Sequence, residues 1–71
     1  EMMTYRFDVG KSLRKVQAET RTSNIEIAKS FGVSPVQVAR WRSAEDLKFS
    51  RVVQLANFFD VSLDDFARLG E

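Results

Sequence analysis

Apolar residues recur every three or four positions along most of this chain, which is the spacing typical of amphipathic helices. In the first such segment, one side of a helical wheel holds Val9, Leu13, Val16 and Thr20, and the other side is charged. This spacing predicts a helix from about Asp8 to Thr20. Ahead of it, residues 4–8 alternate polar and aromatic side chains. The alternation leaves open a short strand, an N-terminal arm or an earlier start of the helix.

A capping motif predicts the start of the second helix. The Ser23 hydroxyl can accept a hydrogen bond from the Glu26 amide, and the Glu26 carboxylate can accept one from the Ser23 amide. The helix is expected over 24–31, and Gly32 should end it because glycine adopts the left-handed conformation without steric cost.

The third helix is expected over 35–43. Ser34 is its cap and Gln37 completes a second capping box. Pro35 takes the first helical position, where an amide proton would have no partner within the helix.

A fourth helix is predicted over 49–59. Its wheel gathers one apolar side, made of Phe49, Val52, Leu55, Ala56 and Phe59. Phe58 points away from that side. Asp60 then stands where a left-handed residue ends the helix, and Ser62 caps a last short helix whose apolar residues are Phe66 and Leu69.

The segments 31–35 and 59–63 echo each other, which we interpret as shared helix-stop and helix-start chemistry and not as a true repeat. Five short helices without a sheet predict an all-α fold, a compact five-helix bundle forming one domain over residues 1–71, with a short N-terminal arm left open. The chain has no cysteine and no histidine. Disulfides are therefore excluded, and a zinc site would need carboxylates alone.

The charge is unevenly distributed, although the net charge is only +1. Residues 6–51 hold ten Lys or Arg against five Asp or Glu, whereas residues 52–71 hold one Arg against four acids. A basic region of this kind is typical of a surface that meets nucleic acid.

The third helix carries the feature that points most directly to function. Val38 and Trp41 lie on one side of its wheel and should anchor it to the other helices. The opposite side displays Val36, Ala39, Arg40 and Ser43, with Pro35 and Gln37 on its flanks. A narrow strip of small residues with one arginine fits a major groove about 12 Å wide, where Arg40 can pair with guanine.

The stretch 9–66 resembles the phage Cro/repressor-type (XRE-like) helix-turn-helix family. The residues that carry the resemblance, in order and spacing, are Ser23, Glu26-Ile27-Ala28, Phe31-Gly32-Val33-Ser34, Val38, Trp41, Leu55-Ala56 and Phe59-Asp60-Val61-Ser62-Leu63-Asp64. The resemblance implies a lambda-repressor-like DNA-binding domain, usually a homodimer that reads two half-sites roughly 34 Å apart, and a role in transcription regulation, often of phage or mobile-element genes.

The resemblance also implies site residues. Base contacts would fall on Pro35, Val36, Gln37, Ala39 and Arg40. Phosphate contacts would fall on Asn24 at the start of the second helix and on Ser43 and Lys48 around the loop after the third. Arg51 is a further candidate for a phosphate contact.

Two departures from the family stand out. Many members pair an arginine of the first helix with a glutamate near the end of the third, where this chain has Gln17 and Arg42. We therefore expect that ion pair to be absent and Arg42 to be free to reach a phosphate. Pro35 and Val36 replace polar residues, so specificity should depend on Arg40 and on DNA shape.

Phe58 on the outward side of the fourth helix suggests a partner surface, which Leu63 and Leu69 could join as a dimer interface. No apolar run is long enough to span a bilayer and no signal-peptide pattern opens the chain, so we expect a cytoplasmic protein. Without histidine, cysteine or a glycine-rich phosphate loop, we expect no enzymatic activity, no cofactor, no metal and no small-molecule ligand.

Two hypotheses follow. The first is a homodimeric, sequence-specific regulator that binds double-stranded DNA as a Cro-like repressor. The second is a protein-interaction module on the same fold, such as an antitoxin or adaptor, favoured by the modest net charge, the apolar Pro35-Val36 pair and Phe58. Salt-sensitive binding to a duplex would separate them.

Overall fold

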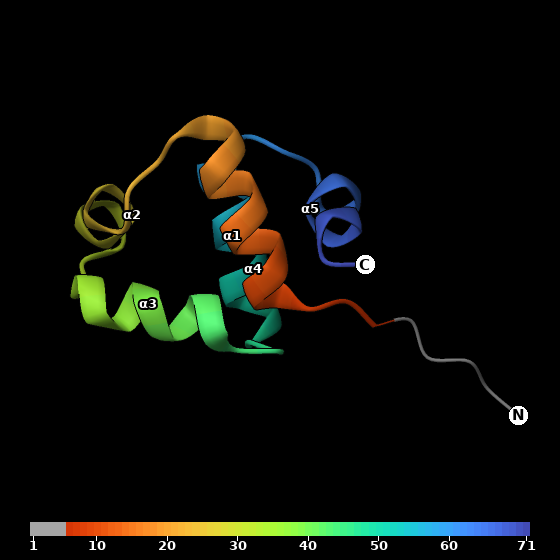
Figure 1. Cartoon of the computed structure of the whole chain (residues 1–71), viewed down its shortest axis with the longest axis horizontal. Coiled ribbons are helices and arrows are strands. Elements are labelled where there is room, and N and C mark those ends of the chain that lie inside the picture. Colours follow the sequence, from red (N-terminus) through yellow and green to blue (C-terminus); the bar gives the residue numbers. More distant parts are fainter. Residues whose placement is uncertain (1–5) are drawn as a thin grey trace, which may run out of the picture.

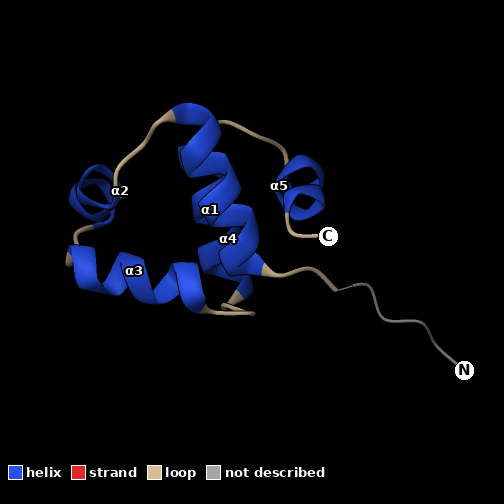
Figure 2. Cartoon of the chain, in the orientation of Figure 1, coloured by secondary structure: helices blue, strands red, loops and turns tan. Residues whose placement is uncertain are grey.

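The computed structural model describes residues 6–71, and in that part of the chain all regular structure is helical (Figure 1 and Figure 2). The helices are α1 (Val9–Thr20), α2 (Asn24–Phe31), α3 (Pro35–Ser43), α4 (Phe49–Phe58) and α5 (Leu63–Leu69). The all-α five-helix prediction is confirmed. The predicted bounds of the second and third helices agree with α2 and α3, and α4 ends one residue earlier than expected.

The first helix lies between two groups of helices. In Figure 1, α1 and α4 cross the middle of the molecule, with α2 and α3 on one side and α5 on the other. Helix α1 packs against both α3 and α5, while α2 packs against α3 and α4 against α5. The buried core runs through every helix and comprises Val9, Leu13, Val16, Ile27, Ala28, Val38, Trp41, Val52, Leu55, Ala56 and Phe66.

Local capping chemistry sets the helix starts. The Ser23 hydroxyl accepts from the Glu26 amide at 3.1 Å and the Glu26 carboxylate accepts from the Ser23 amide at 2.8 Å, so the predicted capping box is present. The second box is only half formed within residues 6–71. Ser34 accepts from the Gln37 amide at 3.2 Å, but the return bond from Ser34 to the Gln37 side chain is not made.

Asp8 decides where α1 begins. Its carboxylate accepts from the Lys11 amide at 3.0 Å, which makes Asp8 the cap and Val9 the first helical residue. Residues 6–8 are neither helix nor strand. An earlier helix start is therefore wrong for these residues, while residues 4–5 of the predicted arm lie outside the described part.

Gly10 allows the end of α3 to dock on the start of α1. The amide of Gly10 donates to the Ala44 carbonyl at 2.8 Å, and that of Val9 donates to the Glu45 carbonyl at 3.1 Å. A Cβ atom at Gly10 would lie 2.5 Å from the Arg42 carbonyl oxygen and 2.6 Å from that of Ala44. Only glycine permits this approach, because such distances are far inside van der Waals contact.

The wheel of α4 predicted two aromatic side chains wrongly. Phe49, expected on the buried side, is 71% exposed. Phe58, expected to point away, is half-buried, and its ring centroid lies 5.7 Å from that of Phe31 and 4.9 Å from that of Phe59. A helical wheel shows which side of a helix a residue is on, but not which parts of that side other helices cover. Here the end of α2 covers Phe58, whereas no helix covers Phe49.

Candidate nucleic-acid interface

Helix α3 presents the strip of side chains expected from its sequence. Val38 and Trp41 are buried, as predicted. On the outward side, Val36 is 63% exposed, and Ala39 and Arg40 are also exposed. Pro35 and Ser43 are exposed too, and Gln37 is half-buried. The structure thus places the expected base-reading residues on one accessible face of one helix.

An aromatic cluster holds this helix at its angle to α2. Trp41 is only 4% exposed, and its ring lies 5.6 Å from the ring of Phe31, edge to face. Such pairs stabilise by about 0.5–1.5 kcal/mol beyond the area that they bury. The expectation that Trp41 is a core residue is confirmed.

Arg51 of α4 lies against the same cluster. Its guanidinium carbon lies 4.5 Å from the centroid of the Trp41 ring and 5.5 Å from that of Phe31, within cation–π range. One of its Nη atoms donates to the Gln54 side chain at 3.1 Å. Arg51 therefore ties α4 to α3, and a contact from it to phosphate would have to compete with these interactions.

Arg42 is not free, contrary to the sequence-based expectation. Its Nη1 donates to Oε1 of Gln17 at 2.7 Å. Gln17 is only 4% exposed, so the hydrogen bond joins α1 to the end of α3 inside the fold. Gln17 stands at the position of the family's arginine and Arg42 at that of its glutamate, so the guanidinium here lies on α3 and donates to an amide of α1. Such a hydrogen bond is charge-assisted and strong.

The same glutamine reaches the start of α2. Its Nε2 donates to Oδ1 of Asn24 at 2.9 Å and to the Thr22 carbonyl at 3.0 Å. Asn24 is half-buried and stands at the first position of α2, where free backbone amides favour an anion. The candidate phosphate contact at the start of α2 and the last turn of α3 therefore share one buried partner.

The sequence alone did not indicate the contacts that Gln17 and Arg14 make between helices. Arg14 of α1 donates through Nη1 to the Arg42 carbonyl, which satisfies one of the last carbonyls of α3. A signal for Gln17 was present, because it follows Leu13 by four positions and so lies on the buried side of α1. A polar residue at a core position needs polar partners.

Charges of both signs lie near the helix ends of this surface. Arg40 and Arg42 occupy the last turn of α3, where cations are stabilised by the helix dipole. The Ser23 amide and hydroxyl, bonded to the Glu26 carboxyl, hold the pKa of that carboxyl below its usual value. Lys48 is exposed directly before α4, and its side chain makes no cap bond to that helix.

The three candidate dimer residues differ in exposure. Phe58 packs on Phe31, and Leu69 is half-buried against the core. Leu63 is 39% exposed and borders an apolar groove of about 420 Å³ together with the exposed Phe49. The groove is lined by Phe7, Val9, Asp46, Leu47, Phe49, Val52, Leu63, Asp64 and Ala67.

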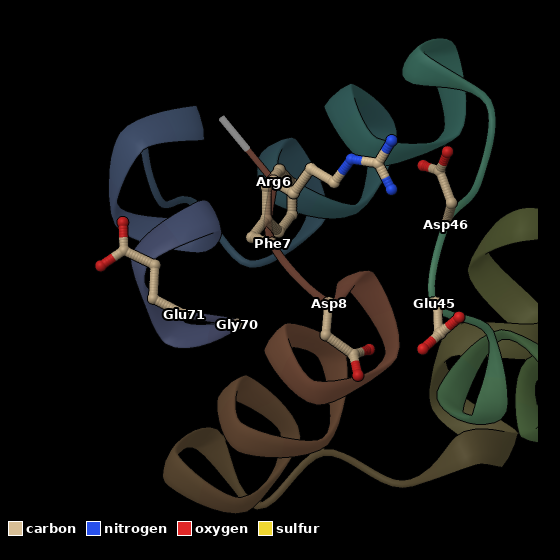
Figure 3. A pocket seen from close by; sticks show the side chains of 7 residues that line it. All are labelled: Arg6, Phe7, Asp8, Glu45, Asp46, Gly70 and Glu71. Atoms are coloured by element: carbon tan, nitrogen blue, oxygen red, sulfur yellow. The ribbon is translucent and has the colours of Figure 1, made fainter. Parts of the chain in front are cut away.

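A larger hollow of about 640 Å³ lies away from the outward face of α3. It is lined by Arg6, Phe7, Asp8, Glu45, Asp46, Gly70 and Glu71 (Figure 3). Its carboxylates do not converge: in Figure 3 those of Glu71 and Asp46 lie on opposite sides. Within residues 6–71 no group of three or more acidic, histidine or cysteine side chains could hold a metal ion.

Comparison with known proteins gives one match. A helix-turn-helix family model matches residues 11–66, which include α2, α3 and the turn between them. No curated protein and no solved structure matches the chain. In the described part, no helix has the length and apolar character needed to cross a membrane.

Proposed function

The chain belongs to the XRE-like helix-turn-helix family of DNA-binding transcription regulators, and we propose that it is a Cro-like repressor that binds an operator as a homodimer. The observation that carries the proposal is the outward face of α3, where small residues surround one arginine on a firmly anchored helix. A repressor of this kind acts by occupying its operator and excluding the polymerase.

Base reading falls mainly to Arg40. Its guanidinium can donate two hydrogen bonds to O6 and N7 of a guanine in the major groove. Val36 and Ala39 let the helix backbone approach and can meet a thymine methyl group. Pro35 and Gln37 flank this strip, and Pro35 adds no hydrogen-bond donor.

Phosphate contacts supply much of the affinity. Asn24 at the start of α2, Ser43 at the end of α3 and Lys48 in the loop that follows can contact the DNA backbone on either side of the groove. Arg42 and Arg51 are also candidates for phosphate contacts, but Arg42 already donates to Gln17 and Arg51 already stacks on Trp41. Each guanidinium would have to bind the phosphate and its partner in the fold together. Counterion release makes this part of the affinity depend on salt.

We place the dimer contact at the apolar groove, with a second copy of the chain as its occupant. Exposed Phe49 and Leu63 border the groove, which makes it a better candidate than Phe58. Helix α5 carries acids in its first turn and Arg68 in its last. Two antiparallel copies would pair Asp64 of one with Arg68 of the other, as a self-complementary interface requires.

The test is selection of a binding site from random duplexes, followed by substitution of Arg40. Arg40→Ala should weaken binding to the selected site by about 10- to 100-fold, the value of a good bidentate base contact. The control is Lys15→Ala, which removes an exposed cation of α1 and should leave base preference unchanged. Equal affinity of Arg40→Ala and the unmodified protein would contradict the assignment of α3.

An antitoxin or adaptor remains the alternative, and the exposed apolar groove is the observation that favours it. Such a protein would use the groove for a different chain. If no duplex is selected at low salt, and Phe49→Ser abolishes co-purification of a protein partner, this alternative replaces the repressor.

A further inference from the structure

We propose that Gln17 is a positioning residue for DNA binding, which turns the amide of Asn24 so that its Nδ2 group donates to a phosphate at the start of α2. The proposal rests on the proposed function, because it concerns the same surface. It assigns a role to a buried residue of α1 that cannot itself reach DNA.

The orientation of the Gln17 amide is fixed from both sides. Arg42 can only donate, so the atom facing its Nη1 at 2.7 Å must be the amide oxygen. The Thr22 carbonyl can only accept, so the atom facing it at 3.0 Å must be the amide nitrogen. A flipped amide would lose both hydrogen bonds and leave two buried polar contacts repulsive.

The orientation of Asn24 follows from that of Gln17. One Nε2 proton of Gln17 goes to the Thr22 carbonyl and the other to Asn24, whose contacting atom at 2.9 Å must therefore be an acceptor. Oδ1 of Asn24 thus faces inward, and its Nδ2 group is turned away from Gln17. A donor at this position suits a phosphate, whereas an oxygen would repel one.

The arrangement connects two parts of the DNA surface. Arg42 belongs to the last turn of α3, and Asn24 begins α2. Because both meet Gln17, the end of the recognition helix fixes the direction of the phosphate contact through a single side chain. Burial of Gln17 at 4% exposure keeps water from competing for these bonds.

The decisive variant is Gln17→Glu. A carboxylate keeps a partner for Arg42 but offers only acceptors to Asn24, whose amide must then turn to donate inward and present its oxygen to the phosphate. We expect the affinity for the selected site to fall about tenfold, the value of a hydrogen bond to a charged group. The matched control is Ala18→Glu, which adds the same charge at the next, exposed position of α1.

Substitution of Asn24 separates this role from a merely structural one. Asn24→Ala should weaken binding about tenfold in the unmodified protein. In the Gln17→Glu background it should cause no loss or a small gain, because the donor is already lost there and a repelling oxygen is removed. A duplex with one methylphosphonate at the contacted phosphate should remove the same coupling. Melting temperatures establish that each variant is folded.

The outcomes distinguish the two proposals. If the unmodified protein selects no duplex, the proposed function fails. If it binds with dependence on Arg40 but Gln17→Glu binds like Ala18→Glu, the role of Gln17 is overturned and the function stands. The role is also overturned if Asn24→Ala costs the same in both backgrounds.

Discussion

The turn between α2 and α3 and the turn between α4 and α5 share one backbone hydrogen bond. In the first, the Val33 amide donates to the Ala28 carbonyl at 3.0 Å, and in the second the Val61 amide donates to the Ala56 carbonyl at 3.0 Å. We refer to α2–turn–α3 as the first unit and to α4–turn–α5 as the second. In Figure 1, the first unit lies on one side of the molecule, whereas the second runs from α4 in the middle to α5 on the other side.

Both turns begin and end with the same chemistry. Gly32 and Asp60 have positive φ angles of 67° and 56°. Ser34 and Ser62 then cap the following helices by accepting from an amide three residues later, at 3.2 and 3.0 Å. The turn therefore accounts for the path of the chain in both units and does not decide what either unit does.

The units differ in the first residues of the helix that follows the turn. Helix α3 begins with Pro35 and Val36, which are uncharged and exposed. Helix α5 begins with Leu63 and then Asp64 and Asp65. Only the first unit can approach a polyanion, because the second would bring two carboxylates to it. The difference teaches that two units with similar turns can present opposite chemistry at the start of their second helix, and the proposed DNA contact uses the uncharged one.

The largest expected effect on DNA affinity comes from placing at the start of α3 an acidic residue like the one at the start of α5. Val36→Asp places a carboxylate at the second position of α3, as Asp64 is placed in α5. We expect the affinity for the selected duplex to fall about 100-fold or more, since a base contact is replaced by a negative charge in the groove. Stability should hold or rise slightly, because an acid suits the first turn of a helix. Fluorescence anisotropy and thermal melting measure the two effects.

The neutral control for that substitution is Val36→Asn, which has nearly the shape of aspartate. If the aspartate variant binds as tightly as the asparagine variant, charge at α3 does not distinguish the units.

The second prediction concerns the way each unit docks on α1. Gly10→Ala should cost about 2 kcal/mol of unfolding free energy, because its Cβ meets the Arg42 and Ala44 carbonyls of the first unit. Gly70→Ala should also destabilise the fold, since its Cβ would lie 2.3 Å from the Asp8 carbonyl oxygen. Urea denaturation gives both values. Only the Gly10 variant should weaken DNA binding as well.

Ser12→Ala is the control for these glycines. Ser12 is buried and its hydroxyl makes no hydrogen bond in the described structure, so its loss should change stability little. A loss as large as that of Gly10→Ala would mean that this part of α1 tolerates no change of any kind.

A third, smaller effect separates the two turn residues. Gly32→Ala should cost about 1 kcal/mol from backbone strain alone, because its Cβ would have no atom within 4 Å. Asp60→Gly should relieve comparable strain and stabilise the protein by up to about 1 kcal/mol. Chemical denaturation should therefore show a lower unfolding free energy for Gly32→Ala and a higher one for Asp60→Gly. Equal signs would show that the two turns are not equivalent.

The smallest expected effect is a pH dependence that comes from the cap of α2 in the first unit. The pKa of Glu26 is lowered in the folded state by its bonds to Ser23. Its stabilisation is therefore fully present above the ordinary glutamate pKa and is lost as pH falls from about 5 toward 3. Helix α4 of the second unit has no side-chain cap at its start.

Melting temperatures across this range test the effect against Glu26→Gln, which keeps a neutral acceptor for the Ser23 amide. The unmodified protein should melt higher near neutral pH, and the two curves should meet at the acidic end. Parallel curves would mean that the capping carboxylate does not contribute through its charge.

Local chemistry explains why most of the fold could be predicted from the sequence. Ser23, Gly32 and Ser34 act on their own neighbours in the chain, so their effect is visible without tertiary structure. The outward face of α3 was also predictable, because a wheel needs only the anchoring of Trp41 to fix which side is exposed.

The rest of the structure depends on contacts between helices that are far apart in the sequence. Phe49 and Phe58 exchanged their expected environments because the neighbours of α4 cover one end of it and not the other. Gln17 and Arg42 meet across 25 positions of sequence, and no periodicity within one helix could pair them. The stacking of Arg51 on Trp41 is of the same kind.

That last contact gives the molecule an optical signal of its own. Trp41 is the one tryptophan of the chain. It lies buried on α3, with the guanidinium of Arg51 over its ring. Its emission therefore comes from a dry site next to a positive charge. If Arg51 leaves the Trp41 ring for a phosphate, the wavelength and intensity of the tryptophan emission change. Binding to the operator can then be followed by intrinsic fluorescence, without an attached dye.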